Sequence, residues 1–203
     1  MTQYNVSVTS NREEGVMLES DFDRKLLNFR VDNNLGKLFK VGINGRYNYT
    51  TVNGAGTSDP GSSSTNRLRN SVKYKPFLAA GETVDYYDPD YTLETSANSL
   101  SLVNPVLLSK QEYRSTKTNV GNINGYVSFK ITDYLTVKST LGYDQAINEI
   151  SIFNDTITSV ARSTGQGQPV AQINSQRRET INNSNVLTFS SDGLKSILSL
   201  IHI

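Results

Sequence analysis

The sequence predicts an all-β fold, a partial antiparallel transmembrane β-barrel of which about six strands lie in this chain. Apolar and polar residues alternate with period two over several runs that are long enough to cross a bilayer as tilted strands. The connections between these runs alternate between tight turns and long polar loops. No run of about eighteen apolar residues occurs, which excludes a transmembrane helix.

The clearest strand covers residues 38–51 and is expected to form a hairpin with the run before it. One face of this strand carries Phe39, Val41, Ile43, Gly45, Tyr47 and Tyr49, and the other carries Lys40, Gly42, Asn44, Arg46 and Asn48. Just upstream, Leu27, Phe29 and Val31 alternate with polar residues. Residues 33–36 contain Asn and Gly, the residues that tight turns favour, so the two runs predict an antiparallel pair.

A second hairpin is expected around Thr132 and Asp133. The apolar positions of its two strands are Ile123, Val127, Phe129 and Ile131, then Leu135, Val137, Leu141, Tyr143 and Ile147. A shorter alternating run contains Tyr4, Val6 and Val8, and a weaker one lies near residues 181–191. These runs complete the expected set of strands.

Strand length and connection length favour a membrane barrel over a soluble sandwich. The runs of about 12 to 16 residues exceed the usual strands of soluble proteins, whereas a transmembrane strand needs about 9 to 11. We expect the tight turns at the periplasmic rim, with Phe39 and Phe129 nearby, and Tyr49 and Tyr143 toward the outer rim as aromatic girdles. The alternative is that the apolar faces cover an ordinary water-soluble core.

Composition limits the possible functions. The net charge is +1, so the chain as a whole has no electrostatic preference for nucleic acid. Cysteine is absent and the one histidine, His202, stands next to the end of the sequence, which leaves no thiolate site or histidine-based triad. We therefore predict neither an enzyme nor a catalytic, metal or cofactor site.

One cluster in the long loop is a candidate ligand site. It is the segment from Asp85 to Tyr91, and its candidate residues are Asp85, Tyr86, Tyr87, Asp88, Asp90 and Tyr91. Aromatic rings stack on sugar faces while carboxylates accept hydroxyl hydrogen bonds, and the same oxygen atoms would suit calcium. Because Asp, Pro and Tyr are common in loops, simple loop packing is the plainer explanation.

Basic residues on the polar faces would project into a barrel lumen. They are Arg24, Arg30, Lys40, Arg46, Lys130 and Lys138. Pairing with Asp32 or Asp144 is the simplest expectation, and contact with a plug or a passing solute is the alternative.

Dispersed pieces of the chain resemble the SusC/RagA family of TonB-dependent outer-membrane transporters of Bacteroidetes. The pieces are Tyr4-Asn5-Val6-Ser7, Ser20-Asp21-Phe22-Asp23-Arg24, Arg30-Val31-Asp32-Asn33, Lys40-Val41-Gly42, Asn104-Pro105, Leu135-Thr136-Val137-Lys138 and Leu141-Gly142-Tyr143-Asp144. The resemblance implies a barrel of about 22 strands around a plug, in the outer membrane of a Gram-negative bacterium. It also implies import of oligosaccharides or peptides, energy from the TonB complex acting through the plug region, and a SusD-like surface lipoprotein as partner.

The chain departs from this family pattern. It contains no plug-like segment and too few strands to close such a barrel, so we expect an interior piece of one. Residues 1–196 are expected to form the barrel segment, with extracellular loops at about 53–118 and 150–180. Residues 197–203 leave the alternating pattern and look foreign or truncated.

The rival hypothesis is a secreted β-sandwich or adhesin that binds glycans through its loops.

Overall fold

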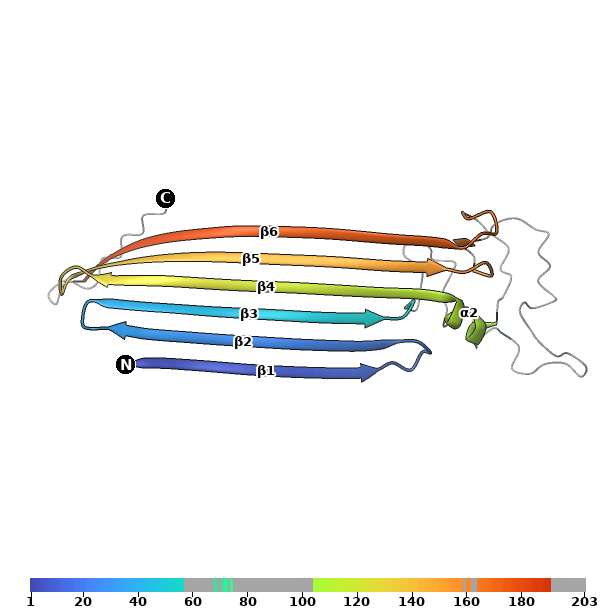
Figure 1. Ribbon diagram of the computed structural model, residues 1–203, viewed down its shortest axis with the longest axis horizontal. Helices are drawn as coiled ribbons and strands as arrows, with labels where there is room; N and C mark the ends of the chain where they lie inside the picture. Colours follow the sequence, from blue (N-terminus) through green and yellow to red (C-terminus); the bar gives the residue numbers. More distant parts are fainter. Residues whose placement is uncertain are drawn as a thin grey trace, which may run out of the picture.

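The chain forms a single sheet of six antiparallel strands in the order β1-β2-β3-β4-β5-β6 (Figure 1). The computed structural model describes residues 1–56, 68, 71, 72, 74, 104–158, 160, 161 and 164–190. The strands are β1 (Thr2–Glu14), β2 (Asp21–Leu35), β3 (Phe39–Asn53), β4 (Glu112–Lys130), β5 (Leu135–Asn154) and β6 (Val170–Phe189). Each strand pairs with the next one along the chain, so the sheet is a meander, and the predicted all-β antiparallel fold is confirmed.

The strands are longer than predicted, and the loops are correspondingly shorter. Strand β1 continues past Val8 to Glu14, and β4 begins at Glu112, well inside the loop expected at 53–118. Strands β5 and β6 also extend into the range 150–180, from which only 155–169 remain as the connection. The added part of β1 is polar on both faces. In the added part of β5, Ile150 and Ile152 lie on the face opposite to Phe153, so neither segment continues the apolar alternation on one face that predicts a strand.

The two kinds of connection lie at opposite ends of the sheet. Residues 36–38 and 131–134 make the tight turns at one end, which lies at the left in Figure 1. Residues 15–20, 54–111 and 155–169 make the connections at the other end. Gly36 has a positive φ of 70°, which suits a glycine in the first tight turn. We call these the tight-turn end and the long-connection end.

A short helix, α2 (Pro105–Gln111), precedes β4 at the long-connection end. The side chain of Asn104 caps the helix by accepting hydrogen bonds from the backbone N–H groups of Val106 (3.0 Å) and Leu107 (3.3 Å). Proline at the first helical position lacks the N–H that would go unpaired there. Within the described residues, no helix has the length and apolar character needed to cross a membrane.

The sheet has no buried core of its own. Among the described residues, the only buried apolar side chain is Ala161, which lies in the 155–169 connection. Large apolar side chains on the strands are instead open, with exposed fractions of 75% at Val8, 56% at Leu141 and 72% at Ile181. The described residues also contain no second sheet over this surface, which a soluble β-sandwich requires.

Candidate functional site

The strand register collects most of the exposed apolar residues of the six strands on one face. Residues paired across antiparallel strands share a face, and one such row runs from Val31 through Ile43 and Gly125 to Leu141. The exposed members of this apolar face include Tyr4, Val6, Val8, Leu27, Leu35, Phe39, Ile43, Tyr47, Tyr113, Ile123, Val127, Leu141, Tyr143, Phe153, Ile173, Ile181, Leu187 and Phe189. An apolar surface of this extent is typical of a protein that contacts lipid or another protein.

Aromatic side chains lie at the tight-turn edge of the apolar face and also farther along its strands. Near the tight-turn end, the rings of Phe39 and Phe129 stack with their centroids 4.5 Å apart. Farther along the strands, the Tyr47 hydroxyl donates to Asn119 Oδ1 (3.0 Å) and the Tyr143 hydroxyl donates to Glu179 Oε1 (2.7 Å). Rings with an apolar body and a polar tip are typical of the boundary between lipid and water.

The opposite, polar face carries a cluster that spans four strands, which we call the Asp32 bracket. Asp32, Gly42 and Tyr126 occupy one row across β2, β3 and β4. The Tyr126 hydroxyl donates to Asp32 Oδ1 (2.6 Å), and Arg30 Nε donates to Asp32 Oδ2 (2.6 Å). From β5, Lys138 Nζ lies 4.8 Å from the centroid of the Tyr126 ring, within range of a cation–π interaction.

Glycine at position 42 permits this arrangement. The Tyr126 ring passes over β3 to reach the carboxylate of Asp32, and a Cβ atom at position 42 would overlap both side chains. The bracket therefore depends on a residue without a side chain at the point where the ring crosses.

Asp144 is the second carboxylate of the polar face, and amide groups hold it. Nδ2 of Asn122 donates to Asp144 Oδ1, and Nδ2 of Asn182 donates to Asp144 Oδ2 (3.1 Å). Asn124 in turn donates to Asn122 Oδ1 (2.6 Å), which extends the network along β4. Charge-assisted hydrogen bonds from neutral amides thus stabilise this carboxylate, and no basic side chain of the described residues forms an ion pair with it.

The predicted lumen pairs are present only in part. The Arg30–Asp32 pair is confirmed, with a side-chain exposure of 67% for Arg30 and 13% for Asp32. Asp144 has amide partners in place of the basic partner that we expected. Lys130 pairs with Asp133 in the second tight turn (2.7 Å), and this hydrogen bond lowers the pKa of the Asp133 carboxyl below its ordinary value.

The Tyr126→Phe substitution tests the bracket. Removing the hydroxyl deletes the hydrogen bond to Asp32 and keeps the ring, so we expect the folded protein to lose about 1 kcal/mol of stability. Denaturant unfolding of the detergent-solubilised full-length protein would measure the loss. Tyr49→Phe is the matched control, because it removes a hydroxyl for which the described residues provide no hydrogen-bond partner, whereas the Tyr143 hydroxyl donates to Glu179. Unchanged stability in Tyr126→Phe would show that water replaces the hydroxyl without loss.

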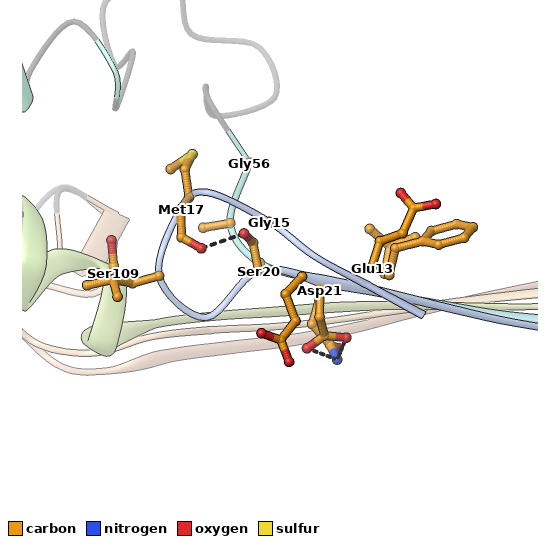
Figure 2. Close-up of a pocket in the computed structure, with 14 residues that line it drawn as sticks. Glu13, Gly15, Met17, Ser20, Asp21, Gly56 and Ser109 are labelled. Carbon is orange, nitrogen blue, oxygen red and sulfur yellow. Dashed lines mark hydrogen bonds between the residues drawn. The ribbon is translucent and has the colours of Figure 1, made fainter. Parts of the chain in front are cut away.

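A hollow of ≈330 Å³ lies at the long-connection end, beneath the 15–20 turn. Figure 2 shows Met17 and Ser20 facing one another across this turn, with Ser109 of α2 on the far side of the hollow. Ser20 Oγ donates to the Met17 carbonyl (2.5 Å), and Asn53 Nδ2 donates to the Asp21 carboxylate (3.0 Å). These polar groups already satisfy one another, so the hollow is chiefly a packing feature of the turn.

A second hollow, of ≈420 Å³, lies at the long-connection end between β4, β5 and β6. Its lining combines aliphatic Ile150 and Ile152 with the polar side chains of Arg114, Gln172 and Asn174, all on the polar face. Ligand sites commonly pair apolar walls with a few polar groups that orient the ligand. This lining would suit a hydrophilic solute that also carries apolar surface.

The predicted loop ligand cluster cannot be compared with these hollows. Asp85, Tyr86, Tyr87, Asp88, Asp90 and Tyr91 all lie outside the described residues, as do residues 197–203. Among the residues that are described, no group of three or more His, Cys, Asp or Glu is arranged to hold a metal ion. The cluster therefore stays a prediction.

Comparison with known proteins points to a class of membrane receptor. No protein-family model matches the chain. The chain is 24% identical over 166 residues to TonB-dependent receptor P3 of Formosa agariphila, an alignment that covers 81% of this chain and 16% of the receptor. The chain thus spans about a sixth of the length of this relative. Together with the six membrane-length antiparallel strands, this similarity supports a TonB-dependent receptor segment whose fold is a partial transmembrane β-barrel.

Proposed function

We propose that this chain forms part of the wall of a SusC/RagA-type TonB-dependent transporter that imports oligosaccharides or peptides. The observation that carries the proposal is a coreless sheet with one apolar and one polar face, together with the similarity to a TonB-dependent receptor. The apolar face would contact the lipid of a Gram-negative outer membrane of the Bacteroidetes type. The polar face would line the passage.

The height of the apolar face agrees with this placement. On β3 the apolar side runs from Phe39 to Tyr49, and at about 3.3 Å per residue with a tilt of about 45° this segment spans roughly 25 Å. That is the height of the lipid-facing band of outer-membrane barrels. The strand segments nearer the long-connection end would then project beyond the bilayer.

The two ends of the sheet would face different compartments. The tight-turn end would face the periplasm and the long-connection end the cell surface, because outer-membrane barrels place short turns inside and long loops outside. The loop that contains Asp85 and Tyr91 would contribute to ligand capture at the surface, where a SusD-like lipoprotein would cap the barrel. The TonB complex would supply energy through a plug.

Cysteine accessibility tests the face assignment, because the chain has no native cysteine. Ile43 and Asn44 are neighbours on β3 that lie on opposite faces. In the full-length protein in outer-membrane vesicles, a charged thiol reagent is expected to label most of Asn44→Cys and little of Ile43→Cys, since charged reagents avoid lipid. Equal labelling of both variants would contradict the assignment.

The same reagent tests the orientation of the rims. Met17→Cys in the 15–20 turn should react in intact cells, whereas Thr132→Cys in the second tight turn should react only after the outer membrane is permeabilised. If Thr132→Cys reacted in intact cells and Met17→Cys only after permeabilisation, the proposed orientation would be inverted.

Heat-modifiable migration in gels would provide a separate check of the barrel itself. A full-length product that stays soluble without detergent would overturn the barrel proposal.

A further inference from the structure

The two faces of the sheet differ in charge as well as in polarity. The register places eight basic residues on the polar face, which are Arg24, Arg30, Lys40, Arg46, Arg114, Lys130, Lys138 and Arg178. Four acidic residues share that face: Glu13, Asp32, Glu112 and Asp144. The apolar face carries Arg12, Lys25, Lys117 and Arg177 against Glu14, Asp21, Asp23, Glu149 and Glu179. The positive excess therefore lies on the polar face alone.

The carboxylates near the middle of the polar face leave much of this positive charge unbalanced. Asp32 is bound by Arg30 and by the Tyr126 hydroxyl, and Asp144 is bound by two amides. Within the described parts of the sheet, neither Lys40 nor Lys138 forms an ion pair with a carboxylate. Lys138 Nζ lies over the Tyr126 ring and Lys40 is near the Asp32 carboxylate, so neither positive charge is neutralised by a direct ion pair and both can attract a negatively charged ligand.

Arg30, Lys40 and Lys138 are basic residues around the bracket, and we call them the basic ledge. Arg30 pairs with Asn44, four residues from Lys40 on β3, so Arg30 and Lys40 are separated by roughly 13 Å along the strands. Lys40 and Lys138 occupy one row, with only Ser128 between them on β4, which separates their backbones by roughly 10 Å. Arg30 lies on the neighbouring strand β2, two residues before Asp32. Beside it is a hollow of ≈360 Å³ lined by Gln3, Tyr4, Asn5, Arg30 and Asp32.

We propose that the basic ledge binds the carboxylate groups of a small anionic oligomer, and that the full-length protein prefers such a solute to a neutral one. This inference rests on the proposed function, because it assumes that the polar face lines the passage. Several cations on one low-dielectric wall attract an anion more strongly than isolated surface charges do. The hollow beside Arg30, which neither lysine lines, falls at the lower end of the size range of small-molecule sites. A hollow of this size favours one unit of an oligomer over a protein surface, and the other units of that oligomer would extend toward Lys40 and Lys138.

Paired charge removals test the ledge. The double variant Lys40→Gln/Lys138→Gln removes two positive charges from the polar face, and Lys25→Gln/Lys117→Gln removes two from the other face. Calorimetry on the detergent-solubilised full-length protein at low salt would compare tetragalacturonate with neutral maltotetraose. We expect the ledge variant to bind tetragalacturonate roughly tenfold more weakly and maltotetraose within about twofold of the parent. The control variant should bind both as the parent does.

Equal weakening in the ledge and control variants, or an equal loss for the neutral sugar, would overturn the inference. A further measurement needs no variant: rising salt should weaken tetragalacturonate binding to the parent protein and leave maltotetraose binding nearly unchanged. Comparison with tetraglutamate would separate an anionic saccharide from an acidic peptide, and either would support the ledge. If the parent protein is a heat-modifiable barrel without anion preference, only this inference fails, whereas absence from the outer membrane overturns the proposed function as well.

Discussion

Replacing Ile43 by arginine is expected to prevent most of the full-length protein from assembling in the outer membrane. Ile43 is 44% exposed on the apolar face, in a row with Gly125 and Leu141 near the middle of the apolar band. An arginine facing lipid near the bilayer midplane of a barrel costs about 2 to 4 kcal/mol. Because proteins are stable by only about 5 to 15 kcal/mol, one such change removes a large share of the total.

Asn44→Arg is the matched control for this prediction. It adds the same side chain one residue later on the same strand, but toward the polar face. Leu141→Arg and Thr140→Arg form a second matched pair on β5. The measurements are the heat-modifiable fraction in membranes and the free energy of unfolding in micelles. If the members of each pair were tolerated equally, the apolar face would not contact lipid.

The strands that alternate apolar and polar residues were predictable from the sequence, and their polar extensions were not. Phe39 to Tyr49 gives a period-two signal, and the turn residues between β2 and β3 set the hairpin. By contrast, the end of β1 reads Ser10-Asn11-Arg12-Glu13-Glu14, in which neither face is apolar. These residues form a strand because their backbones pair with β2 from Asp21 to Lys25. Backbone pairing cannot be recognised in the hydrophobic pattern of the sequence.

The helix before β4 did leave a local signal. Asn104 followed by Pro105 is a typical helix start, with a capping side chain and then a proline at the first helical position. The sequence nevertheless predicts one extended loop at 53–118. The polar composition of that loop outweighed a two-residue motif.

Within the polar-face network, only the contact between residues close together in the sequence was predictable. Arg30 and Asp32 are two residues apart on one strand, so they share a face whatever the register. The contact of Tyr126 with Asp32 joins residues far apart in the sequence, and it requires the register of both β2–β3 and β3–β4. Gly42 beneath the ring was the single clue, since glycine inside a strand often marks close approach of another group.

Replacing Gly42 by valine is expected to break the Asp32 bracket. A Cβ atom there would overlap the Tyr126 ring and the Asp32 carboxylate, and valine adds two further methyl groups. Overpacking of this kind costs about 1 to 3 kcal/mol, and losing the Tyr126 hydrogen bond adds about 1 kcal/mol. Denaturant unfolding of the full-length protein in detergent should show the sum.

Gly125→Val and a double variant identify the cause of that loss. A Cβ atom at Gly125 would meet nothing closer than 4.0 Å, and the glycine lines an open groove on the apolar face, so this substitution should leave stability unchanged or raise it. If the clash with the ring is the cause, Gly42→Val should cost much less in a Tyr126→Ala background, since the obstructing ring is then absent. If Gly42→Val lowered the free energy of unfolding equally in both backgrounds, the cause would instead be a distortion of the β3 backbone. A large interaction free energy between the two substitutions would establish that Tyr126, lying over Gly42, joins β2, β3 and β4 on the polar face. This contact would then fix the positions of the basic-ledge residues around the bracket.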